Sequence, residues 1–216
     1  MPRMNLAGEQ FKLMQNGKVY SVSDLSQEGL AFRVLDQTDL SLFTVGAEVT
    51  GMLNLRTLKF PFRSRVRHQR RDLVGCQFEW LGPGLAESLK RYLDPAELGR
   101  ELQPAPPLEG GHILYHGPSG TEVMLMRAID GQFLRFTVYA LGQLVQWDHE
   151  TGLVTGIARA SREEGEIRGA FRYETLLLHR DPRPDPGKLE IAKKLLLSSN
   201  LPESLVRWSV RQLTSS

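Results

Sequence analysis

Apolar and polar residues alternate along the first half of the chain with the two-residue period of β-strands. Between residues 58 and 66, Leu58, Phe60, Phe62 and Val66 fall on one face of such a strand. Residues 73–80 repeat the alternation. The pattern predicts that this half of the chain is built mainly from strands.

The same alternation returns after residue 120. Asp130-Gly131 and residues 148–152 are typical hairpin sequences, because aspartate, asparagine and glycine tolerate the backbone angles of tight turns. We expect an antiparallel meander in this half. Its strands are predicted at residues 121–127, 133–139, 144–147, 153–158 and 167–179.

The period changes to a helical one after the proline-broken segment 181–186. Residues 188–199 place Leu189, Ala192 and Leu196 one turn apart. Asn200 then resembles the N-cap of a last helix. This helix carries two apolar stripes, one of which contains Trp208, so it docks either on its own sheet or on a partner, and we favour its own sheet. The predicted fold class is mainly β, with an α+β C-terminal part that ends in two helices.

A segment rich in proline and glycine divides the chain. Pro104, Pro106 and Pro107 stiffen residues 99–111 and remove backbone donors, and Gly110 and Gly111 loosen its end. We therefore predict a first domain at residues 1–98, a linker at 99–111 and a C-terminal α+β domain at 112–216.

Composition and charge exclude several classes of protein. The hydrophobic fraction of 41% is sufficient for ordinary cores, and the net charge of +2 gives no overall attraction to nucleic acid or to a membrane. Cys76 is the only cysteine, which excludes an intramolecular disulfide and suits a reducing compartment. No apolar run approaches about eighteen residues. We expect a cytoplasmic protein without membrane insertion.

The most informative motif is D-x-S-x-x-G, formed by Asp24, Ser26 and Gly29 between two strand-like segments. Two short polar side chains on a turn offer acceptors and a hydroxyl donor at close range. A glycine lets the backbone bend, or lets a flat ligand come close. The same residues also suit a hydrogen-bonded turn that binds nothing. The motif alone leaves both interpretations open.

Three segments follow one another in the first half of the chain. They are D-L-S-Q-E-G at residues 24–29, which contains this motif, V-G-A-E-V-T-G-M-L-N-L at 45–55, and L-V-G-C-Q-F-E-W-L at 73–81. A short helix is predicted after them at 85–93. With them, residues 4–95 resemble a PilZ domain, the small bacterial β-barrel that receives the second messenger cyclic di-GMP. The resemblance implies a six-stranded barrel closed by the third segment and capped by the helix. It also implies that Asp24, Ser26 and Gly29 contact a guanine.

The chain departs from the family at the arginine arm. PilZ domains that bind cyclic di-GMP carry R-x-x-x-R upstream of the aspartate, and here the only upstream arginine is Arg3. If Arg3 is the first of the pair, Ala7 occupies the second position; if it is the second, the first would precede Met1. A lost bidentate arginine contact costs about 1–3 kcal/mol, or about tenfold to a hundredfold in affinity. The resemblance therefore implies that Arg3 supplies a partial arm and that binding is weakened or absent.

The densest charge cluster is F-R-S-R-V-R-H-Q-R-R at residues 62–71. On a strand, its first three arginines share the face opposite Phe62, Ser64 and Val66. This face is either a solvated barrel exterior, a surface for an anion or an acidic protein partner, or a substitute nucleotide contact. The candidate surface consists of Arg63, Arg65, Arg67, Arg70 and Arg71.

The remaining chemistry-bearing residues indicate neither a metal site nor an enzyme. His112 and His116 are four apart, which on a strand separates them by about 13 Å, too far to share one metal. Cys76 lies in the apolar alternation of a strand and reads as a buried thiol. The chain shows no local phosphate-loop or nucleophile motif. We expect no catalytic residue, no metal and no cofactor.

Two functions remain, both in signalling. In the first, the barrel binds cyclic di-GMP with low affinity and the second domain relays its state to a protein partner. In the second, the barrel is a degenerate PilZ adaptor that binds no nucleotide and acts through protein contacts in motility or surface-appendage regulation. Neither function involves a nucleic-acid polymer.

Overall fold

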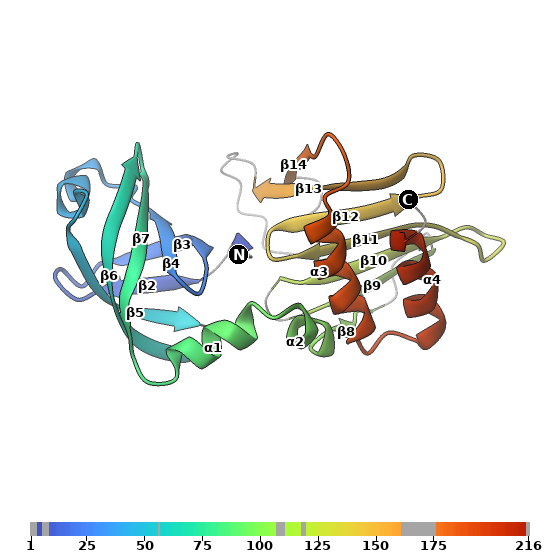
Figure 1. Ribbon diagram of the computed structural model, residues 1–216, viewed down its shortest axis with the longest axis horizontal. Coiled ribbons are helices and arrows are strands. Elements are labelled where there is room, and N and C mark those ends of the chain that lie inside the picture. Colours follow the sequence, from blue (N-terminus) through green and yellow to red (C-terminus); the bar gives the residue numbers. More distant parts are fainter. Residues whose placement is uncertain are drawn as a thin grey trace. The chain divides into compact units, whose positions relative to one another are not determined.

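The chain folds into two compact units, Met1–Asp94 and Pro95–Ser216 (Figure 1). The structure is a computed structural model, and it describes residues 4–5, 9–55, 57–106, 111–117, 120–160 and 176–214. Each unit has its own antiparallel sheet, and none of the described strands belongs to both. Each unit is therefore described by itself.

The first unit is a closed six-stranded antiparallel barrel, as predicted. Its hydrogen-bonded order is β3-β2-β5-β6-β7-β4, and pairing of β3 with β4 closes the ring. A short additional strand pairs with β3, placing Met4 opposite Leu25 and Asn5 opposite Asp24. The strands are β1 (Met4–Asn5), β2 (Gln10–Leu13), β3 (Val19–Leu25), β4 (Gly29–Arg33), β5 (Glu48–Leu55), β6 (Leu58–Arg70) and β7 (Leu73–Leu81).

Aromatic rings fill the barrel. Phe11 packs edge-on against Phe32 and Phe62, with ring centroids 4.8 and 5.5 Å apart, and all three side chains are fully buried. These rings stand at the inward positions of the sequence alternation, so burying them drives closure of the barrel. The helix α1 (Leu85–Tyr92) follows β7 and buries Leu85 and Leu89, which confirms the predicted capping helix.

One end of the barrel is covered by the 3₁₀ helix η1 (Gln37–Phe43). Its Asp39 carboxylate is nearly buried and accepts hydrogen bonds from Lys18 Nζ at 2.7 and 2.8 Å and from Tyr20 Oη at 3.0 Å. A buried carboxylate needs such partners to offset its desolvation. The network therefore fixes η1 against β3.

The second unit is a seven-stranded antiparallel sheet in which chain order and spatial order coincide, as predicted for a meander. Helices α3 and α4 lie over one face of the sheet (Figure 1). The strands are β8 (Gln103–Pro104), β9 (His112–His116), β10 (Glu122–Arg127), β11 (Phe133–Ala140), β12 (Gln143–Asp148), β13 (Gly152–Ala160) and β14 (Leu176–Arg180). The helices are α2 (Pro95–Arg100), α3 (Pro186–Leu197) and α4 (Glu203–Thr214). Residues 167–175 of the last predicted strand lie outside the described residues.

The terminal helix docks on its own sheet through Trp208, which confirms the favoured alternative. Its indole contacts Phe133, Phe136 and Trp147, with ring centroids 4.8, 5.7 and 5.3 Å apart. The last helix begins at Glu203 rather than directly after Asn200, and the Asn200 side-chain amide instead donates to the Arg100 carbonyl at 2.8 Å. The predicted N-cap was therefore wrong.

Part of the predicted linker lies in secondary structure, at the end of α2 and in β8. Gly99 lies in the last turn of α2, where a Cβ would stand 2.2 Å from the Leu195 carbonyl oxygen of α3, so only glycine allows the two helices to approach this closely. Pro104 lies in β8 at the sheet edge, where a missing backbone donor is tolerated. Of the predicted linker 99–111, residues 99–106 thus belong to the second unit. Gly99 and Pro104 thus serve helix packing and an edge strand.

Among the helices in the described part of the chain, none combines the length and the apolar character that crossing a membrane requires.

Candidate functional site

The D-x-S-x-x-G motif forms the β3–β4 hairpin. Asp24 is half-buried in β3, in register with Ala31 of β4, and Gly29 begins β4. Ser26 lies in the turn between the strands. The hairpin thus brings all three residues of the motif together.

The Ser26 hydroxyl is engaged within this turn. Its Oγ accepts the backbone N–H groups of Gly29 at 3.1 Å and Glu28 at 3.3 Å, and it donates to the Gly29 carbonyl at 3.2 Å. A hydroxyl has one donor and two acceptor positions, and these three bonds use all of them. Ser26 therefore shapes the hairpin.

Gly29 is required by a close approach of two strands. It lies in register with Gln77 of β7, and a Cβ at Gly29 would stand 2.1 Å from the backbone oxygen of Cys76. No side chain fits at that distance. Gly29 consequently holds the hairpin tightly against β7, and the remaining polar side chain of the motif is that of Asp24.

Arg3, predicted to supply the arginine arm, lies outside the described residues.

The arginine-rich strand β6 has the predicted two-faced pattern. Phe62, Ser64 and Val66 are fully buried, whereas the side chains of Arg63 and Arg67 are exposed. The strand presents its arginines to the barrel exterior. Their guanidinium groups can therefore contact side chains at the outward positions of the neighbouring strands β5 and β7.

Arg65 is committed to the barrel itself. Its Nε lies 2.5 Å from Glu79 Oε1, and its Nη1 donates to the Gly46 carbonyl at 2.9 Å. The hydrogen bond from Arg65, reinforced by its charge, lowers the pKa of Glu79, with smaller contributions from Arg63 and Arg67. Arg65 therefore ties β6 to β7 and to the loop before β5.

The other four arginines of the cluster differ from Arg65. Arg67 donates its Nε–H to the neutral side-chain oxygen of Gln77 at 2.9 Å. Within the described ranges, none of the four has a carboxylate in ion-pair contact, and Arg71 occupies the β6–β7 turn with a positive φ of 53°. The four arginines without an ion pair among the described residues are Arg63, Arg67, Arg70 and Arg71.

Cys76 is buried in β7, as its sequence context predicted. Burial raises the pKa of its thiol to about 12, against an opposing hydrogen bond from Ser64. At neutral pH the sulfur is protonated and enclosed, which does not suit a nucleophile. Over the stretches that the structure describes, no group of three or more histidine, cysteine or acidic side chains is arranged to hold a metal ion.

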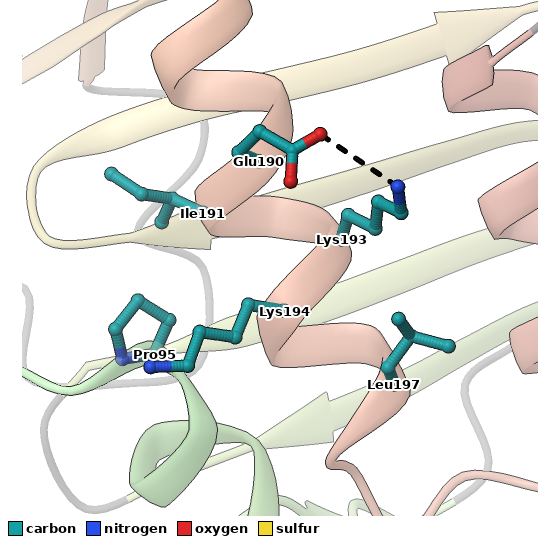
Figure 2. Close-up of a pocket in the computed structure, with 6 residues that line it drawn as sticks. All are labelled: Pro95, Glu190, Ile191, Lys193, Lys194 and Leu197. Carbon is teal, nitrogen blue, oxygen red and sulfur yellow. Dashed lines mark ion pairs between the residues drawn. The ribbon is translucent and has the colours of Figure 1, made fainter.

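A shallow hollow of about 390 Å³ lies between α2 and α3 in the second unit (Figure 2). Its rim includes an ion pair between Glu190 and Lys193, with N and O 3.7 Å apart. The lining side chains belong to Pro95, Glu190, Ile191, Lys193, Lys194 and Leu197. Sequence analysis did not find this feature, because helical spacing alone does not show which helices pack side by side.

Comparison with known proteins agrees with the barrel. Residues 3–94 match the sequence profile of the family described as PilZ domain. A comparison with curated proteins found no match. PilZ domains are receptor or adaptor domains rather than enzymes. The N-terminal unit of this chain is a member of the PilZ domain family.

Proposed function

We propose that this protein is a signalling receptor whose barrel binds cyclic di-GMP with low affinity and whose second unit relays the bound state to a protein partner in the cytoplasm. The observation that carries the proposal is the β3–β4 hairpin of a PilZ barrel with Asp24, Ser26 and Gly29 in place. The proposal assigns no catalytic residue.

The chemistry of guanine assigns the three residues different roles. The base presents N–H donors on its pairing edge, and a carboxylate is an acceptor with two oxygens. Asp24 is the acceptor that this hairpin offers to guanine. Ser26 holds the turn through its three hydrogen bonds, and Gly29 removes the side chain that would separate β4 from β7.

Low affinity follows from the incomplete arginine arm. The two phosphates and two guanines of cyclic di-GMP offer several acceptors for guanidinium groups. Arg3 alone supplies only some of the hydrogen bonds that the two arginines of R-x-x-x-R would make. The loss of one bidentate contact weakens binding by about tenfold to a hundredfold. We therefore expect a dissociation constant in the micromolar range or poorer.

The experiment is a titration of the ¹⁵N-labelled full chain with cyclic di-GMP, followed by amide chemical shifts. The proposal predicts saturable shifts at the amides of residues 24–29. If the shifts do not saturate, or if they fall only in the second unit, the barrel is not the receptor.

A second candidate function is that of an adaptor without nucleotide, and the barrel end around η1 favours it. The Val34 amide donates to the Asp72 carbonyl at 2.8 Å, which places Leu35 beside the β6–β7 turn. The Gly46 amide donates to the Val66 carbonyl at 2.9 Å, which places the loop after η1 beside β6. Three large apolar side chains are exposed along this path, those of Leu35, Leu42 and Val45.

Exposed apolar side chains next to arginines are typical of protein interfaces. As an adaptor, the protein would present this barrel end, with Arg70 and Arg71, to an acidic partner. Affinity capture with the wild-type chain and with a Leu35→Ser, Val45→Ser variant tests this function. A partner lost in the variant supports it, and the same captured proteins at the same yield contradict it.

A further inference from the structure

The barrel brings the D-x-S-x-x-G hairpin and the arginine-rich strand onto neighbouring strands. Gly29 of β4 lies in register with Gln77 of β7, and Gln77 lies in register with Arg65 of β6. Adjacent strands are about 4.8 Å apart, so β6 runs about 10 Å from β4 on the barrel surface. Gly29 and Arg65, almost forty positions apart in the sequence, thus lie at the same level of the barrel on either side of Gln77.

Arg67 has an unusual position on β6. Val66 pairs with Cys76 and His68 pairs with Gly75, so Arg67 is the extra residue of a β-bulge and has no register partner on β7. Bulges turn side chains away from the regular pleat and are frequent beside binding sites. Because of the bulge, no side chain of β7 lies directly opposite Arg67.

The contact with Gln77 then directs this side chain toward the hairpin. Arg67 Nε donates to Gln77 Oε1 at 2.9 Å, and Gln77 is the residue opposite Gly29. The acceptor is neutral, so no carboxylate in hydrogen-bond contact offsets the charge of the Arg67 guanidinium, whereas Glu79 offsets that of Arg65. The described contacts of Arg67 use only its Nε–H, which leaves the four N–H groups on its Nη atoms for a ligand.

The surface of β4 beside Asp24 is low. The outward residues there are Gly29 and Ala31, and Asp24 on β3 lies in register with Ala31. Arg33, the remaining outward residue of β4, forms an ion pair with Asp72. A ligand that lies over β4 and β7 would therefore meet a carboxylate at its β3 side and a guanidinium at its β6 side. A guanine needs the first of these groups and a phosphate the second.

We propose that Arg67 supplies the phosphate-binding guanidinium that the incomplete arginine arm lacks, with Asp24 holding a guanine of the same cyclic di-GMP molecule. The inference rests on the proposed function, because it assigns a further residue to that site. It explains how binding persists without R-x-x-x-R. It also assigns Gln77 the role of holding the guanidinium in place.

The test is calorimetric titration of cyclic di-GMP into the full chain and its variants. Arg67→Ala removes the contact, and Arg67→Lys keeps the charge without the fork of two donors. Gln77→Ala removes the acceptor that holds Arg67. Arg63→Ala is the matched control, because Arg63 is exposed on the same strand about 13 Å away and has no carboxylate partner of its own among the described residues.

We expect Arg67→Ala to lower the affinity by about tenfold to a hundredfold, and Arg67→Lys and Gln77→Ala to lower it less. Arg63→Ala should stay within about twofold, because an exposed charge at that distance is largely screened. All four variants should keep the wild-type melting temperature, since Arg63, Arg67 and Gln77 are exposed and exposed polar side chains contribute little to stability. A loss of binding without a change in melting temperature separates a ligand contact from a structural role.

Two other results overturn the inference in different ways. If the wild-type chain shows no binding at millimolar cyclic di-GMP, the proposed function fails and the inference fails with it. If the wild type binds and Arg67→Ala binds equally well, or if Arg67→Ala and Arg63→Ala lose affinity equally, only the inference fails. In either of those cases, Arg67 makes no specific contact with the nucleotide.

Discussion

Arg65 and Glu79 form an ion pair across β6 and β7, with Nε and Oε1 2.5 Å apart, although Arg65 belongs to the exposed face of an arginine-rich strand. Arg63, on the same face, has no such partner in the described part of the chain. Neighbouring arginines of one cluster thus have different roles. Arg65 stabilises the barrel, whereas Arg63 is not engaged in such an ion pair.

We predict that Arg65→Ser lowers the melting temperature of the barrel, whereas Arg63→Ser leaves it unchanged. The reason is that Arg65 also donates to the Gly46 carbonyl, so its loss leaves two acceptors unpaired. Differential scanning calorimetry of both variants is the measurement. Equal melting temperatures would show that the pair contributes nothing.

The same pair should be visible in the pH dependence of stability. Arg65 lowers the pKa of Glu79 in the folded chain below its ordinary value of 4.5. The contribution of Glu79 is therefore fully present above about pH 4.5 and is lost as the pH falls through the lowered pKa. Arg65→Ser should flatten this part of the acid-unfolding profile.

Gly29→Ala should destabilise the barrel by about 2 kcal/mol, because the new methyl group collides with backbone and the strands must separate. Gly75→Ala is the matched control on the neighbouring strand. Its Cβ would come equally close, at 2.1 Å, but only to the imidazole of His68, an exposed side chain that can rotate away. Urea unfolding measures both, and a similar loss in both would contradict the assigned role of Gly29.

Cys76 should resist thiol reagents until the barrel unfolds. Its thiol is buried and its pKa is raised to about 12. At pH 8, labelling with a chromogenic disulfide reagent should be slow in buffer and fast in denaturing urea. Since the folded pKa exceeds the ordinary value of 9.0, stability should also fall as the pH rises above about 9. Fast labelling of the folded chain would place the sulfur at the surface.

Residues 1–94 and 95–216, expressed separately, should each fold and unfold cooperatively. Each has its own sheet and its own buried apolar cluster, with Phe11 and Phe32 in one and Phe136 and Val138 in the other. Circular dichroism melting of the two fragments is the measurement. If the second fragment lacks a cooperative transition, the boundary at Asp94 and Pro95 is not a folding boundary.

Local periodicity predicted the elements well, and it could not predict contacts between them. The alternation around Phe62 and Val66 indicated which residues face the core, because a strand allows only two faces. It was wrong for Leu58, which is exposed at the first position of β6. Nothing in the sequence marked Arg67 as a bulge residue, since a bulge depends on the register of the partner strand. The sequence predicted Gly99 to be a linker residue. Its packing partner, Leu195, lies almost a hundred positions away, so local periodicity could not show the close approach.

The most direct test of the central claim is calorimetric titration of cyclic di-GMP into the wild-type chain and into Asp24→Ala. Glu28→Ala is the control, because this exposed carboxylate lies on the same turn. The account predicts a dissociation constant in the micromolar range or poorer for the wild type, at least tenfold weaker binding by Asp24→Ala, and unchanged binding by Glu28→Ala. No binding by the wild type, or undiminished binding by Asp24→Ala, would contradict it.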